Sequence, residues 1–115
     1  MTTGETTNDA SPRISEVRTM VGDRAAADAI ARRLVEDRLA ACVQIVGGID
    51  SIYRWKDSIE QAAEWRLTVK TSLPRTAACV ASLVAQHAYE LPEVLVSEVI
   101  ASQAYAEWVI RSTSP

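Results

Sequence analysis

The spacing of apolar and polar residues changes several times along the chain, and each change marks a different element. Apolar and polar residues begin to alternate at Ile14, and the alternation continues to Val21. A period of two is typical of a β-strand, so residues 14–21 predict the first strand. Residues 94–100 form another apolar-rich run shortly after Pro92, and we expect the last strand there.

Residues 24–40 repeat their apolar positions at helical spacing instead. The stripe that this spacing predicts to face the core consists of Ala27, Ile30, Ala31, Leu34 and Val35. Asp23 stands just before the helix, where its carboxylate can accept hydrogen bonds from the first free amides. On the opposite side, Asp28–Arg32 and Arg33–Asp37 predict ion pairs four residues apart, each worth about 0.2–0.5 kcal/mol.

The middle of the chain predicts a long β-hairpin. Alternating runs at 41–53 and 59–71 flank the turn candidate W-K-D-S at 55–58. Gly47 and Gly48 interrupt the first run, and paired glycines inside a strand pattern predict a bulge or bend rather than an end. The hairpin is longer than two covering helices require, so we expect it to overhang its own domain.

Two further helices follow the hairpin. Ser72 is expected to cap the first, with Pro74 in its opening turn, and that helix must end before Pro92. The face predicted for it carries Leu73, Ala77, Val80, Val84 and His87. Ser102 is expected to cap a short final helix, whose stripe carries Tyr105, Trp108 and Val109.

The resulting order is β-α-β-β-α-β plus a C-terminal helix. This order predicts an α+β, ferredoxin-like fold in which one antiparallel sheet carries both main helices on a single face. We expect one domain over residues 13–115 and a flexible tail over residues 1–12, which are polar and lack an apolar anchor. Because the other sheet face and the overhanging hairpin lack a cover, we expect a homo-oligomer.

The composition and net charge of the chain limit the classes of function that we expect. The chain has 115 residues, of which 48% are hydrophobic, which suits a single modest core. A net charge of −3 argues against a nucleic-acid partner. No apolar run is long enough to cross a bilayer, and the first residues lack the pattern of a secretion signal, so we expect a cytoplasmic protein without a membrane partner.

Catalytic motifs are absent from the sequence, and we expect no enzyme. We find neither a phosphate-binding glycine loop nor a nucleophile elbow. Glu60 and Glu64 share a strand face and are interpreted as solvated charges. Lys70 ends a strand, where it is either solvated or in contact with an anion.

His87 is the only histidine, and two interpretations of it stay open. It either hydrogen-bonds free carbonyls at a helix end or ligates copper or zinc together with other side chains. Cys42 and Cys79 lie in Ala- and Val-rich stretches, where a small buried thiol is common, and we expect no disulfide between them in a reducing compartment.

Five motifs occur in one order and resemble the CutA divalent-cation-tolerance family over residues 14–111. They are L-A-A-C at 39–42, S-I-Y-R-W at 51–55, E-W-R-L-T-V-K-T at 64–71, H-A-Y-E-L-P-E at 87–93 and Y-A-E-W at 105–108. The resemblance implies a ferredoxin-like subunit that forms a homotrimer through its long hairpin, similar to PII signalling proteins. It further implies a role in tolerance of copper and other divalent cations, without an accepted enzymatic activity.

The resemblance also suggests metal ligands. Some bacterial relatives combine a first-strand cysteine with a His-His pair, and these positions correspond to Thr19 and Gln86–His87 here. Only His87 matches, and Cys42 occupies the L-A-A-C cysteine. We therefore expect copper or another divalent cation to bind at most weakly, through His87 with Cys42 or carboxylates.

Two alternatives remain beside metal tolerance. The chain could be a PII-like module that binds a small anionic ligand between subunits, or an adaptor trimer whose motifs are architectural. The residues assigned to such a cleft or to the trimer interface are Tyr53, Trp55, Glu64, Lys70, Tyr89, Pro92, Glu93 and Trp108. Tyr89 in particular is expected to reach a neighbouring subunit.

Overall fold

The computed structural model describes residues 11–115, so most of the expected tail lies outside the described residues. The elements follow the predicted order. They are β1 (Arg13–Val21), α2 (Arg24–Glu36), β2 (Cys42–Trp55), β3 (Ser58–Thr71), a 3₁₀ turn (Leu73–Arg75), α3 (Thr76–Gln86), β4 (Leu95–Ile100) and α4 (Gln103–Ser112).

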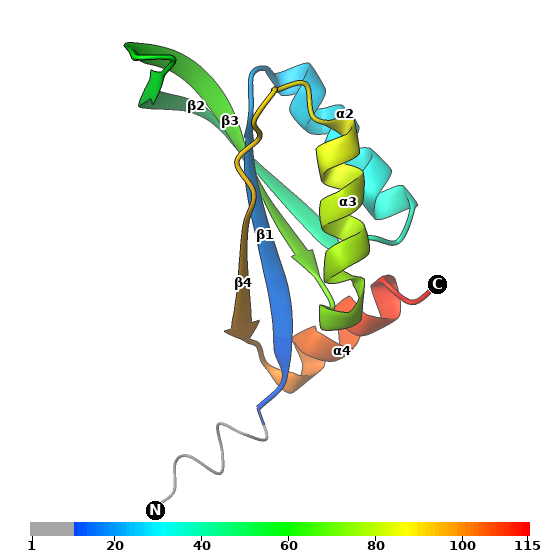
Figure 1. Cartoon of the computed structure of the whole chain (residues 1–115). Helices are drawn as coiled ribbons and strands as arrows, with labels where there is room; N and C mark the ends of the chain where they lie inside the picture. The colour runs from blue at the N-terminus through cyan, green and yellow to red at the C-terminus, as the bar shows by residue number, and fades with distance from the viewer. Residues whose placement is uncertain (1–10) are drawn as a thin grey trace, which may run out of the picture.

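The four strands form one sheet in the order β2-β3-β1-β4, and all three pairings are antiparallel. Helices α2 and α3 cover one face, α4 crosses the end where β1 begins, and the β2-β3 hairpin extends beyond the other end (Figure 1). This arrangement confirms the α+β, ferredoxin-like prediction.

The core lies between the sheet and the two covering helices. Val17, Leu67 and Val69 from the sheet are fully buried against Leu34 of α2 and Leu83 of α3. Burial of each such side chain contributes about 1.5–3 kcal/mol. A smaller cluster, made by Ile14, Ala106 and Val109, fixes α4 to the sheet.

Helix α2 agrees with its prediction except at its end. Asp23 Oδ1 accepts from the Ala26 amide at 2.7 Å, and both expected ion pairs are present. The helix ends at Glu36 rather than Ala40, because the amides of residues 39 and 40 both donate to the carbonyl of Leu34 and turn the chain toward β2. Val35 was wrongly assigned to the buried stripe and is 44% exposed.

The hairpin contains both predicted irregularities. The register between β2 and β3 shifts between Val46 and Ile49, and Gly48 adopts a φ of +73°, so the glycines form a bulge. Lys56 and Asp57 make the tip with φ values of 48° and 68°, as a two-residue turn of type I′ requires.

The second main helix differs from its prediction. Residues 73–75 form a 3₁₀ turn, and the Ser72 hydroxyl bonds Thr113 of the α4 end at 2.8 Å instead of capping. Cys79 and Leu83 form the buried face, whereas Leu73 is 40% exposed and Val84 45% exposed.

Helix α4 has the expected cap, because Ser102 Oγ accepts from the Tyr105 amide. Its buried residues are Ala106 and Val109. Tyr105 and Trp108 were expected on the same stripe, but they are partly exposed and stack on each other with ring centroids 5.5 Å apart.

Large apolar side chains remain exposed where the sequence predicts a missing cover. Ile52 and Ile59 on the hairpin are 70% and 63% exposed, and Leu95 and Ile100 on β4 are 53% and 55% exposed. Such a concentration on projecting strands is typical of a protein–protein contact surface. None of the helices among residues 11–115 is long and apolar enough to span a membrane.

Candidate functional site

His87 ends α3 and uses both of its ring nitrogens. Nε2 lies 2.8 Å from the Met20 carbonyl oxygen and 3.1 Å from Thr19 Oγ1, while Nδ1 accepts from the Tyr89 amide at 3.2 Å. Because Nδ1 accepts, we assign the ring proton to Nε2, which donates to the carbonyl. The imidazole therefore joins the helix end to β1 and has no free lone pair in this arrangement.

Two positions that the family resemblance singled out thus lie in contact. Thr19 and His87 are separated by 68 positions in the chain and are hydrogen-bonded in the fold. A threonine hydroxyl is a poor ligand for copper compared with a thiolate. The pair forms a polar link between strand and helix, which agrees with the interpretation of His87 as a group at a helix end, although its carbonyl partner belongs to β1.

Tyr89 lies two residues further along and bonds a buried carboxylate. Its hydroxyl donates to Glu64 Oε2 at 2.7 Å, and it packs over Gly22, where an added Cβ would lie 3.3 Å from the hydroxyl oxygen. Tyr89 therefore has a hydrogen-bond partner within the single chain, and its contact with a neighbouring subunit stays a prediction. The expectation of a solvated Glu64 is wrong, since the residue is only 8% exposed.

The environment of the Tyr89 hydroxyl changes its ionisation. Burial of the hydroxyl end raises the pKa of Tyr89 well above its usual value, and the hydrogen bond to Glu64 raises that pKa further. The phenol consequently remains a proton donor to the carboxylate. Together, His87, Tyr89 and Glu64 fasten the loop after α3 to β1 and β3.

The two cysteines lie elsewhere and are not linked. Cys42 is partly buried at the start of β2 and pairs in register with Lys70, whereas Cys79 is fully buried on the core-facing side of α3. Burial raises the pKa of the Cys79 thiol to about 11. Cys42 lies toward the opposite end of the sheet from His87, so these two predicted ligands do not share a site within one chain.

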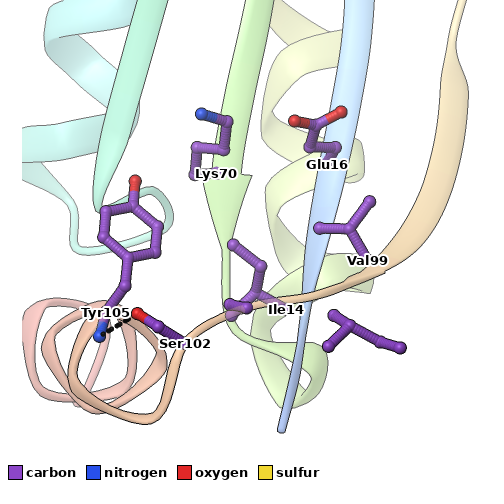
Figure 2. A pocket seen from close by; sticks show the side chains of 8 residues that line it. Ile14, Glu16, Lys70, Val99, Ser102 and Tyr105 are labelled. Carbon is purple, nitrogen blue, oxygen red and sulfur yellow. Dashed lines mark hydrogen bonds between the residues drawn. The ribbon is translucent and has the colours of Figure 1, made fainter. Parts of the chain in front are cut away.

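Lys70 lines a shallow cavity of about 360 Å³ on the sheet face opposite α2 and α3. Figure 2 shows Lys70 and Glu16 on adjacent strands, with Tyr105 of α4 and Val99 of β4 on either side. Lys70 Nζ donates to Gln44 at 3.2 Å, and Glu16 pairs with Arg18. Lys70, the residue that the sequence predicts to contact an anion, therefore lines a cavity.

The remaining predicted residues do not converge on one point. Tyr53 and Trp55 lie near the hairpin tip, where Lys56 stacks on the Trp55 ring at 5.6 Å. Pro92 and Glu93 lie in the loop before β4, and Trp108 lies on α4. Within a single chain, the residues predicted to line one cleft therefore lie in separate places, with Tyr89 and Glu64 at one and Lys70 at another.

The contacts that Thr19 and Gly22 make with residues 87–89 were not predicted from the sequence. The contact of each with the 87–89 segment depends on the packing of α3 against β1, which no local pattern encodes. Among residues 11–115, no group of three or more His, Cys, Asp and Glu side chains could hold a metal ion.

Known proteins share this sequence and architecture. A divalent-cation tolerance protein CutA of Thermus thermophilus is 38% identical over 85 residues, covering 73% of this chain and 82% of that protein. The chloroplastic CutA of Arabidopsis thaliana is 35% identical over 94 residues, and the chain spans about half of its length. The crystal structure of CutA from Xylella fastidiosa superposes with a TM-score of 0.85 at 33% identity, covering 88% of this chain and 98% of that one.

The family described as CutA1 divalent ion tolerance protein matches residues 15–112, nearly the whole described domain. The match includes β1, the hairpin, the 87–93 segment and α4. The chain is a member of the CutA1 divalent ion tolerance family.

Proposed function

We propose that this protein acts in divalent-cation tolerance, as the names of its bacterial relatives state for them. The observation that supports the proposal is the family match over residues 15–112, with the fold shared across the domain. The family is not known as one of enzymes, and we propose a role in binding or assembly rather than catalysis.

We further propose that a metal ion binds this chain at most weakly. An ion at His87 would have to take the Nδ1 lone pair from the Tyr89 amide or displace the proton that Nε2 donates to Met20. Cys42 is too far along the sheet to complete a site with His87 in the same chain. Copper or another divalent cation remains the proposed ion, with His87 and Cys42 as separate candidate contacts.

The proposed partner is the protein itself, as a homotrimer. The exposed isoleucines of the hairpin and the exposed edge residues of β4 support this assembly, because monomers seldom leave such side chains uncovered. In such a trimer, Tyr53, Trp55 and Trp108 would lie at or near contacts between subunits. A net charge of −3 supports the absence of a nucleic-acid partner, and the cytoplasmic location and lack of a membrane partner stay predictions.

A second candidate function is the binding of a small anion at the Lys70 cavity. The cavity combines the Lys70 ammonium with aromatic and aliphatic walls, as ligand pockets often do, and the Glu16 carboxylate that also lines it is paired with Arg18. A thermal-shift screen of nucleotides and small acids against wild type and Lys70→Gln distinguishes the two functions. A ligand that stabilises only the wild type supports this second function.

Growth of a bacterial strain that lacks its own CutA-family gene tests the tolerance proposal. Expression of this chain is expected to restore growth in medium with added Cu(II). The His87→Gln variant is expected to restore it equally, because the proposal does not depend on a site at His87. Growth that stays at the level of the empty vector, despite comparable soluble protein, would contradict the proposal.

A further inference from the structure

A second cavity lies where the beginning of α3 meets the end of α4, at the opposite end of α3 from His87 (Figure 1). Its volume is about 350 Å³, within the range of small-molecule sites. We propose that this cavity binds a small monocarboxylate with an apolar body. The residues that line it are Arg13, Ser72, Leu73, Pro74, Arg75, Ile110, Thr113, Ser114 and Pro115.

Two guanidinium groups line the cavity without carboxylate partners. No aspartate or glutamate side chain is among the lining residues, and neither Arg13 nor Arg75 forms an ion pair with any described carboxylate, the terminal one of Pro115 included. The Nε atom of Arg75 is buried and has no hydrogen-bond partner within the described chain. A buried donor without a partner is costly, and because this atom is not exposed, the Arg75 guanidinium would have to turn toward the cavity to give it a ligand oxygen.

The hydroxyl groups around the cavity already have partners. Ser72 Oγ bonds Thr113 Oγ1 at 2.8 Å, Thr113 Oγ1 also donates to the Val109 carbonyl, and Ser114 Oγ donates to the Ile110 carbonyl. The arginines are therefore the groups available to a ligand. A planar guanidinium favours a planar carboxylate, with which it can form two parallel hydrogen bonds.

The helix start adds to the attraction for an anion. Ser72 makes no side-chain cap, and neither the 3₁₀ turn nor α3 has an acidic residue in its first turn. The partial positive charge of the helix N-terminus is thus not neutralised by a side chain of that turn.

The remaining lining residues determine which uncharged part of a ligand the cavity favours. Leu73, Pro74, Ile110 and Pro115 contribute apolar walls, and Leu73 and Ile110 are 40% and 52% exposed without a ligand. Apolar walls favour a carboxylate that carries an alkyl or aryl chain over a bare inorganic anion.

Heteronuclear NMR of the full chain with hexanoate as the probe tests this proposal. Titration is expected to shift the Arg75 Nε–H resonance and the backbone amides of residues 72–76 and 110–114. Hexanamide lacks the charge that the guanidinium groups favour, and inorganic phosphate lacks the apolar body that the walls favour, so each is expected to bind at least about tenfold more weakly.

Hexanoate binding by single-residue variants tests whether the ligand occupies this cavity. Arg75→Gln is expected to weaken hexanoate binding by about tenfold or more, and Arg13→Gln by a smaller factor because Arg13 is exposed. Arg111→Gln, on the same helix end but outside the lining, and Lys70→Gln, in the other cavity, are expected to bind like wild type. Equal binding by wild type and folded Arg75→Gln, phosphate binding as tight as hexanoate, or no shift of these resonances would each overturn the proposal.

Discussion

The Nε2 atom of His87 lies 2.8 Å from the carbonyl oxygen of Met20, which joins the end of α3 to β1 across 67 positions of the chain. Met20 is only 9% exposed, so its carbonyl has little access to water as a substitute partner. The second ring nitrogen accepts from Tyr89 and orients the loop toward Glu64. The histidine is thus part of the folded framework.

His87→Ala is expected to lower the free energy of unfolding by about 1–3 kcal/mol, because it leaves the Met20 carbonyl without its partner. Urea denaturation at a fixed protomer concentration measures the change, since an oligomer's stability depends on concentration. Gln86→Ala is the matched control, as Gln86 bonds only Ser82 on the same helix. If both variants lose the same small amount of unfolding free energy, the His87 contacts contribute nothing to stability.

Tyr89→Phe is expected to lower stability at neutral pH and to change its dependence on alkaline pH. The folded state raises the pKa of Tyr89, so the contribution of the protonated phenol is fully present below the unfolded value of about 10 and is lost as pH rises above it. The free energy of unfolding of wild type should therefore fall more steeply above pH of about 10 than that of Tyr89→Phe. Tyr105→Phe serves as the control and should keep the wild-type slope.

The two thiols are expected to differ in reactivity. Burial raises the pKa of Cys79 to about 11, and the residue is fully buried, whereas Cys42 is partly accessible. A thiol reagent with a coloured product should titrate Cys42 first in the native protein and both cysteines in denaturant. Rapid labelling of native Cys42→Ser would mean that Cys79 is not buried as described.

Gly47→Ala and Gly48→Ala are expected to differ in severity. A Cβ on Gly47 would overlap the Trp65 ring, whereas a Cβ on Gly48 meets nothing within 4 Å but needs a φ of +73°. The Gly48 variant should lose about 1–2 kcal/mol from the left-handed conformation. The Gly47 variant should lose more and should alter the near-ultraviolet circular dichroism of tryptophan, and equal losses with unchanged spectra would contradict the close approach.

Substitutions of the exposed hairpin isoleucines test the proposed trimer. Light scattering of wild type is expected to give about three times the protomer mass of 12.5 kDa. Ile52→Asp and Ile59→Asp should lower this mass, because each would place a charge in a subunit contact. Glu60→Gln is the control on the same strand and should leave the mass unchanged. A wild-type mass equal to one protomer would contradict the assembly.

Features of local origin could be predicted from the sequence. The caps at Asp23 and Ser102, the bulge at Gly47–Gly48 and the turn after Trp55 depend on neighbouring residues, and each occurs where its pattern places it. The element order then fixed the fold class, because few topologies accommodate it.

Features that depend on distant residues could not be predicted. The burial of Glu64 depends on Tyr89, which lies 25 positions away. The buried face of α3 was misplaced because the 3₁₀ turn at 73–75 has fewer residues per turn, so a helical pattern counted from Leu73 is out of phase by Cys79. The pairing of Thr19 with His87 likewise needs the packed fold.

We propose that this CutA1 family member binds a divalent cation at most weakly at His87. Calorimetric titration of Cu(II) into wild type, His87→Gln and Cys42→Ser measures this binding. We expect a wild-type dissociation constant weaker than about 1 μM, equivalent to about −8.2 kcal/mol, and no more than a small change in His87→Gln. A submicromolar site in wild type that disappears in folded His87→Gln would mean that His87 is a strong metal ligand, against this proposal.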